Sequence, residues 1–133
     1  MRILAPALGL WAMASGAVAQ DVGVIEGVIS DQLEAFNARD LESAWQHASP
    51  TIKGLFGTPE TFGRMVEQGY PMVWDNRSAQ FLEIRESAGA FWQKVLIQDA
   101  QGALHVLDYL MVETADGWQI NAVQLLQGPE VGA

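Results

Sequence analysis

The fold follows from residues 91–113, which read FWQKVLIQDAQGALHVLDYLMVE. Two runs in this stretch, Phe91 to Gln98 and Ala103 to Glu113, are rich in the Val, Ile, Leu and aromatic side chains that favour β-strands. Between them lies Gln101-Gly102, which suits a tight turn because glycine adopts backbone angles that other residues avoid. The stretch therefore predicts an antiparallel hairpin.

Runs of similar composition lie on both sides of this hairpin. We predict a strand from Gln80 to Arg85 before it and another from Trp118 to Gln127 after it. The pairs Ala88-Gly89 and Asp116-Gly117 supply the connecting turns. Four consecutive strands joined by short turns predict an antiparallel meander.

Three helices are predicted before the strands. From Val24 to Phe36, apolar residues recur at spacings of three and four, which is typical of an amphipathic helix. A second helix follows Asp40, whose side chain can cap it, and ends at Ser49-Pro50. A third starts at Thr58-Pro59 and ends at Gly69. Helices followed by an antiparallel sheet of about four strands predict an α+β fold.

The composition limits the class of protein. The chain has 133 residues, enough for one domain, of which half are apolar and 17% are charged. Its net charge of −9 argues against binding to nucleic acid. Without cysteine there are no disulfides or thiolate sites, and His47 and His105 lie in no ligand-spacing motif, so we predict neither metal nor cofactor.

Residues 1–19 have the pattern of a signal peptide. An apolar run follows Arg2 and ends in Ala17-Val18-Ala19, the small-x-small pattern that signal peptidases accept, so we predict cleavage after Ala19. The alternative is an uncleaved anchor, but the run is shorter than the roughly 20 residues of a spanning helix, and Pro6 interrupts it.

The mature chain is then periplasmic or secreted and has no stable membrane insertion. Six basic and sixteen acidic residues leave it a net charge of −10, which disfavours binding to a membrane surface. One domain spans residues 24–127, and residues 128–133 are predicted to be a frayed tail.

The order of several segments resembles a known family. These segments are QLEAFNARD (32–40), ASPTIKGLFG (48–57), GYPMVW (69–74), WQKV (92–95), HVLDYLMV (105–112) and WQINAVQLL (118–126). Together they resemble an uncharacterised proteobacterial family of domains of unknown function, within the nuclear transport factor 2-like, SnoaL-like superfamily. The resemblance covers Val24 to Gln127. It implies a cystatin-like cone, in which a curved sheet wraps around helices and leaves a pocket in its mouth. The superfamily includes isomerases, dehydratases, ligand carriers and dimerisation modules, so the fold alone selects no function.

Asp108 and His105 are the candidate catalytic residues, and they lie on opposite faces of one strand. If the face of Asp108 lines the pocket, its carboxyl could act as a general acid or base, as pocket carboxylates do in ketosteroid-isomerase-like members. The alternative is a structural carboxylate that binds a backbone group. A shift of one residue would instead turn His105 and Tyr109 inward, with His105 as the candidate base.

Four further residues are candidate ligand-binding residues. Tyr70 and Trp74 flank a proline between a helix and a strand, where they could form the lip of a pocket or simply fill its open end. The amides of Gln93 and Asn121 could orient a ligand, or they could satisfy buried backbone groups.

These observations favour an exported domain that binds a small apolar ligand or a protein partner without catalysis. The second hypothesis is a cofactor-independent acid–base enzyme, of isomerase or dehydratase type, that uses Asp108 with help from Tyr70 or His105. The third is a purely structural dimerisation module. A homodimer is predicted through the outer sheet face, whose apolar residues would be Trp92, Leu96, Leu107, Tyr109 and Met111. An open cavity with Asp108 in its wall would support catalysis, an open cavity lined only by apolar groups would support binding, and a filled cone would support the structural hypothesis.

Overall fold

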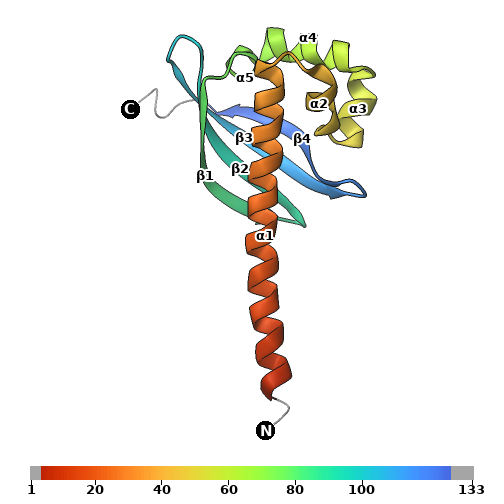
Figure 1. Cartoon of the computed structure of the whole chain (residues 1–133), viewed down its shortest axis with the longest axis vertical. Helices are drawn as coiled ribbons and strands as arrows, with labels where there is room; N and C mark the ends of the chain where they lie inside the picture. Colours follow the sequence, from red (N-terminus) through yellow and green to blue (C-terminus); the bar gives the residue numbers. More distant parts are fainter. Residues whose placement is uncertain (1–3, 127–133) are drawn as a thin grey trace.

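The computed structural model describes the backbone of residues 4–126 and side chains from residue 18 onward; the predicted tail lies outside this range. Within residues 4–126, five helices come first and four strands follow (Figure 1). The helices are α1 (Leu4–Asn37), α2 (Leu41–Gln46), α3 (Pro50–Phe56), α4 (Pro59–Gly69) and α5 (Pro71–Trp74). The strands are β1 (Ser78–Ser87), β2 (Ala90–Gln98), β3 (Leu104–Thr114) and β4 (Gly117–Leu126). The predicted α+β class is confirmed.

The four strands form one antiparallel sheet in the order β1-β2-β3-β4, as the predicted meander requires. The turn between β1 and β2 has positive φ at both Ala88 (53°) and Gly89 (84°), which is the backbone of a two-residue hairpin turn. Glycine also takes the positive-φ position in the turns after β2 and β3, at Gly102 and Gly117. The glycine turns that mark the hairpins in the sequence are thus confirmed.

Helix α1 is longer than predicted, because it starts at Leu4 rather than near Val24. Its first part projects past the sheet, and its second part packs against the core (Figure 1). The packed part buries the predicted stripe, with Ile25, Ile29, Leu33 and Phe36 all at most 3% exposed. Within residues 4–126, no helix combines the length and the apolar character needed to cross a membrane.

The region between residues 47 and 75 contains two helices that the sequence did not predict. Ser49-Pro50 was predicted to end a helix, but Ser49 Oγ accepts a hydrogen bond from Ile52 N (3.2 Å) and caps the start of α3. A proline fits the first turn of a helix as well as the segment after one, so the same dipeptide allows both interpretations. In the same way, Pro71 starts the single turn of α5 in the predicted loop.

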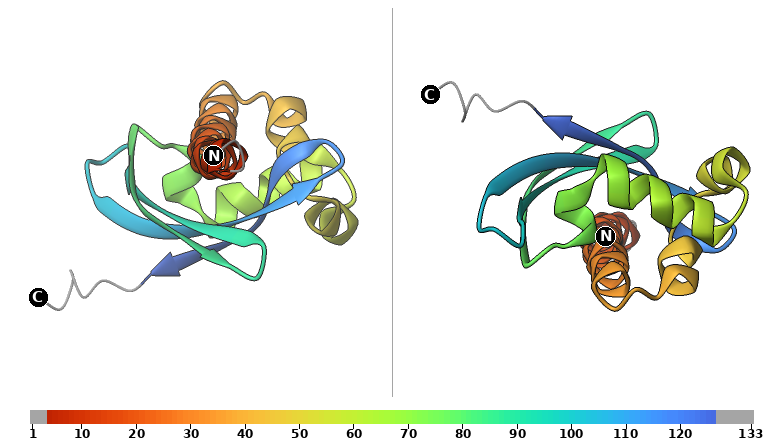
Figure 2. Two further views of the ribbon diagram at one scale, coloured as in Figure 1. Left: turned by 90° about the horizontal axis from the view of Figure 1, so that it is seen from below. Right: turned by 90° about the horizontal axis from the view of Figure 1, so that it is seen from above.

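All five helices lie on one side of the sheet, so the sheet has a helix-covered face and an outer face (Figure 2). On the helix-covered face of β3 the buried residues are Leu107, Tyr109 and Met111. The outer face therefore consists of the alternate residues, among them Trp92, Leu96 and Asp108. The prediction that Leu107, Tyr109 and Met111 belong to an outer apolar patch is wrong, because these three side chains form the core against the helices.

Candidate ligand-binding site

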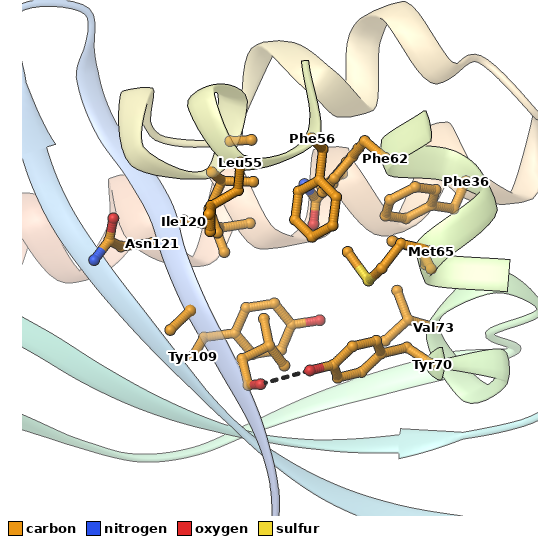
Figure 3. A pocket seen from close by; sticks show the side chains of 16 residues that line it. Phe36, Leu55, Phe56, Phe62, Met65, Tyr70, Val73, Tyr109, Ile120 and Asn121 are labelled. Carbon is orange, nitrogen blue, oxygen red and sulfur yellow. Dashed lines mark hydrogen bonds between the residues drawn. The ribbon is translucent and has the colours of Figure 1, made fainter. Parts of the chain in front are cut away.

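A cavity of about 340 Å³ lies between the helices and the last two strands (Figure 3). None of the described side chains that line it is charged. Its apolar wall consists of Phe36, Ala48, Ile52, Leu55, Phe56, Phe62, Met65, Val66, Val73, Ile120, Ala122 and Val123. The polar side chains among the described lining residues are Gln32, Tyr70, Tyr109 and Asn121.

Helix α4 supplies much of the wall, and its placement follows from local sequence. Thr58 Oγ1 accepts a hydrogen bond from Thr61 N (3.1 Å), which caps the helix, and Phe62 then packs edge-on against Trp45 with 5.5 Å between ring centroids. Gly63 lets the helix approach Leu41 closely, since a Cβ there would lie 2.7 Å from a Leu41 methyl carbon. This contact holds α4 against α2 and so fixes one side of the cavity.

The rim of the cavity carries an exposed apolar side chain. Leu55 of α3 is 71% exposed, yet it lines the cavity (Figure 3). Helix α3 is tied to the sheet beside it, because Ser49 Oγ donates a hydrogen bond to Asn121 Oδ1 (2.7 Å) and Ser49 N donates to Ile120 O (2.9 Å). Asn121 therefore lines the cavity, and its side-chain oxygen accepts the hydrogen bond that holds the rim, while its binding of a ligand stays a prediction.

Tyr70 lies at the junction of α4 and α5, inside the predicted lip segment. Its hydroxyl donates a hydrogen bond to Val123 O at 3.0 Å, which links this junction to β4 (Figure 3). The Tyr70 ring lines the cavity, and its one hydroxyl proton is used within the protein.

Tyr109 is the polar residue buried deepest in the wall. It is 1% exposed, and no described residue forms a hydrogen bond with its hydroxyl. In Figure 3 the hydroxyl points toward the space between Met65, Val73 and Tyr70. Burial, and to a smaller extent the neighbouring Tyr70, raises the pKa of Tyr109, so the hydroxyl keeps its proton at neutral pH.

Asp108 lies on the outer face, away from this cavity. Arg85 binds it with two hydrogen bonds, Nη1 to Oδ1 at 3.2 Å and Nη2 to Oδ2 at 2.7 Å. The Asp108 side chain is 7% exposed and that of Arg85 is 40% exposed. The condition for a catalytic Asp108, that its face of the strand lines the pocket, is therefore not met at this cavity: strand alternation turns the side chain to the opposite face, where an arginine neutralises it.

His105 has the parity of the helix-covered face but does not reach the cavity. Its Nε2 lies 2.8 Å from Asp99 Oδ2, and Asp99 Oδ1 accepts hydrogen bonds from Gln101 N and Ala103 N (both 2.9 Å). The hydrogen bond from His105 is the main reason that the pKa of Asp99 is lowered. The structure thus places His105 beside the turn between β2 and β3.

Trp74 and Gln93 also lie outside the cavity wall. The Arg39 guanidinium lies over the Trp74 ring, 4.1 Å from its centroid, so this indole is covered by a cation. Gln93 is fully buried, and its Nε2 donates to Lys94 O (2.8 Å) and to Leu82 O (3.0 Å), where β1 is irregular. The Gln93 Nε2 group thus satisfies backbone carbonyls, as the structural alternative expects, while its Oε1 has no partner among the described residues.

A second, more polar hollow of about 430 Å³ lies beside α1 and the start of β4. His47, Lys53 and Asp116 contribute charged or titratable groups of both signs to it. Across the described side chains, no three His, Asp or Glu residues converge as metal ligands. The apolar cavity therefore remains the better-defined candidate site.

Residues 18–133 match the model of a family described as a domain of unknown function (DUF4864). The chain belongs to this family. No curated protein and no solved structure matches the chain. The resemblance to the wider nuclear transport factor 2-like superfamily therefore stays a prediction.

Proposed function

We propose that this domain binds a small apolar ligand in the cavity between α3, α4 and β4, without transforming it. The observation that carries the proposal is a cavity of about 340 Å³ whose wall is almost entirely apolar. Protein cores contain few voids larger than a water molecule, whereas small-molecule pockets start near roughly 300 Å³. The exposed Leu55 at the rim further favours an opening that a ligand uses.

The chemistry of the wall favours binding over acid–base catalysis. Of the two wall tyrosines, Tyr70 uses its proton on Val123 O, and burial raises the pKa of Tyr109. A hydroxyl that holds its proton this firmly donates hydrogen bonds but does not act as a base at neutral pH. Asp108, the carboxyl in the enzyme hypothesis, lies on the other face with Arg85.

We also propose that the domain acts outside the cytoplasm, after cleavage behind Ala19. The signal-like pattern of residues 1–19 supports this, and so does the family match, which begins at residue 18. Val18, Ala19 and Gln20 are exposed, whereas Trp118 Nε1 donates a hydrogen bond to Asp21 Oδ1 (3.2 Å). Cleavage at this position would leave that contact in the mature chain. Mass spectrometry of the protein recovered from a periplasmic extract tests the cleavage site.

The neutral fluorescent probe N-phenyl-1-naphthylamine tests the binding proposal. We expect its emission to rise on adding the mature protein, because the probe becomes brighter in an apolar site. Met65→Trp should fill the cavity and weaken binding at least about tenfold. Leu104→Trp, at an outer position that is 63% exposed, is the matched control and should bind as the parent does.

A second variant covers the case in which Met65→Trp disturbs the fold. Leu55→Asp changes an exposed rim residue, so the fold should survive, while the new charge beside the opening should weaken probe binding. Far-UV circular dichroism checks that each variant is folded. The proposal is wrong if the parent fails to bind the probe, or if neither wall variant changes its affinity.

The outer sheet face supports self-association as a second candidate function. Trp92, Leu96, Val106 and Leu110 are apolar residues of β2 and β3 on this face, and each is only half-buried. We propose that two copies of the chain cover this face mutually. Light scattering of the parent and of Leu110→Lys tests it: a monomeric parent at high concentration would remove the proposal.

A further inference from the structure

We infer that the Tyr109 hydroxyl donates a hydrogen bond to the ligand, and that the ligand is an uncharged molecule with one oxygen acceptor in an otherwise apolar body. The inference rests on the proposed binding function and specifies its chemistry. The acceptor is a carbonyl, ether or hydroxyl oxygen.

The first support is the burial of this hydroxyl without a partner. Tyr109 is 1% exposed, and its hydroxyl forms no hydrogen bond with any described residue. Buried polar atoms in native proteins almost always have a partner, because water is lost on burial and must be replaced. A hydroxyl left without one at the wall of a cavity marks the position where an acceptor belongs.

The direction of the hydroxyl is the second support. Figure 3 shows it pointing toward the region between Met65, Val73 and Tyr70, all of which line the cavity. The nearby Tyr70 hydroxyl donates its only proton to Val123 O. The open hydrogen-bond donor in this part of the wall is therefore that of Tyr109.

The remaining wall restricts the charge of the ligand. Among the residues that the structure describes, no Lys, Arg, Asp or Glu lines the cavity. A carboxylate or an ammonium group there would be buried without a countercharge, at a large free-energy cost. An uncharged oxygen costs far less to bury and gains one hydrogen bond from Tyr109.

The test uses two probes that differ in one group. The first, 2-acetylnaphthalene, carries a carbonyl oxygen; in the second, 2-isopropenylnaphthalene, a CH₂ group of similar shape replaces that oxygen. Displacement of N-phenyl-1-naphthylamine gives the affinity of each. We expect the parent to bind the acetyl probe about fivefold more tightly, which is the ordinary net effect of one hydrogen bond.

Tyr109→Phe removes only the hydroxyl and should bring the ratio of the two affinities to about one. Tyr70→Phe is the matched control: it removes the hydroxyl that is already bonded to Val123 O, so it should change both affinities together and keep the ratio. An infrared measurement gives a second readout. The C=O stretch of bound 2-acetylnaphthalene, isotopically labelled at the carbonyl, should lie at a lower frequency in the parent than in Tyr109→Phe.

Failure of this inference can be distinguished from failure of the proposed ligand-binding function. If neither naphthalene displaces the fluorescent probe and that probe itself does not bind, the binding function fails. If both naphthalenes bind the parent equally, and Tyr109→Phe changes neither the ratio nor the C=O stretch, the inference is overturned while the binding function stands.

Discussion

Asp108 and Tyr109 are neighbours in the chain, and they show how differently the two faces of β3 treat a buried polar group. Asp108 points to the outer face, where Arg85 donates two hydrogen bonds to its carboxylate. Tyr109 points to the helix-covered face, where its hydroxyl has no partner among the described residues. The Asp108 carboxylate, which is the more costly group to bury, is thus neutralised, whereas the uncharged Tyr109 hydroxyl is left without a hydrogen-bond partner among the described residues.

The two faces therefore differ in whether their buried polar group is still available to a ligand. A carboxylate that is already paired has little capacity left for a ligand, and the loss of its partner destabilises the fold. A protonated hydroxyl can stay unpartnered at a moderate cost, and it keeps a donor available beside the cavity. The comparison predicts opposite effects on stability: removing the partner of Asp108 should destabilise the protein, whereas removing the unpartnered hydroxyl of Tyr109 should not.

The largest effect is expected on the outer face, from Arg85→Met. This change leaves the Asp108 carboxylate, which is 7% exposed, without its two donors. We expect a loss of about 2 kcal/mol in the free energy of unfolding, below the roughly 3–5 kcal/mol of a fully buried pair because Arg85 is 40% exposed. Urea denaturation measures it.

Lys94→Met is the matched control for that change. Lys94 Nζ lies 3.5 Å from the exposed Glu83, so its loss should change the free energy of unfolding by less than about 0.5 kcal/mol. Adding Asp108→Leu to Arg85→Met should restore part of the lost stability, since no buried charge then remains unpaired. If Arg85→Met and Lys94→Met were equally mild, Asp108 would not depend on its arginine.

A smaller effect is expected from Tyr70→Phe on the helix-covered face. The variant removes the hydrogen bond to Val123 O (3.0 Å) and leaves that carbonyl without this donor. We expect the free energy of unfolding to fall by about 1 kcal/mol. Equilibrium denaturation of the ligand-free protein provides the measurement, and an unchanged midpoint would show that the tyrosine hydroxyl adds nothing to the fold.

His47, the C-cap residue of α2, is a half-buried titratable group, and it makes the stability of the protein depend on pH. Its pKa is lowered mainly by burial and further by Lys53, while Asp31 acts in the opposite direction. The unfolded chain therefore takes up the proton first as the pH falls through about 6.5. The contribution of His47 to the free energy of unfolding is therefore full above about pH 6.5, and it is lost as the pH falls below that value.

The corresponding variant is His47→Gln. Between about pH 7.5 and 5.5, the parent should lose more stability than the variant, because only the parent carries this proton-linked contribution. Thermal unfolding of both proteins at several pH values measures the difference, and the carboxylates and His105 are common to both. Parallel curves would contradict the lowered pKa of His47.

The strands could be predicted from the sequence because each turn carries its own signal. Ala88-Gly89 and Asp116-Gly117 interrupt runs of β-favouring residues, so the meander follows from local information. Helix α3 could not be predicted, because Pro50 fits equally after one helix and at the start of the next. The actual choice depends on the Ser49 cap and on its contact with Asn121.

The site was harder to predict because both faces of β3 are largely apolar. Alternation alone left open which face meets the helices, and so it left open whether Asp108 or Tyr109 lines a cavity. A signal was present in β2, where Lys94 is the cross-strand partner of Asp108. Two charged residues opposite one another indicate the outer face, and this assigns Tyr109 to the inner one.

The smallest effect, and the one of opposite sign, is expected from Tyr109→Phe. Since the hydroxyl has no partner in the described part of the protein, its removal breaks no hydrogen bond and relieves an unsatisfied buried group. The free energy of unfolding of the ligand-free protein should therefore stay the same or rise, by up to about 1 kcal/mol. Denaturation beside Tyr70→Phe makes the comparison direct, because the two variants delete the same atom from the same cavity. A loss as large as that of Tyr70→Phe would mean that the Tyr109 hydroxyl already has a partner in solution, such as an ordered water, and the contrast between the two faces would then disappear.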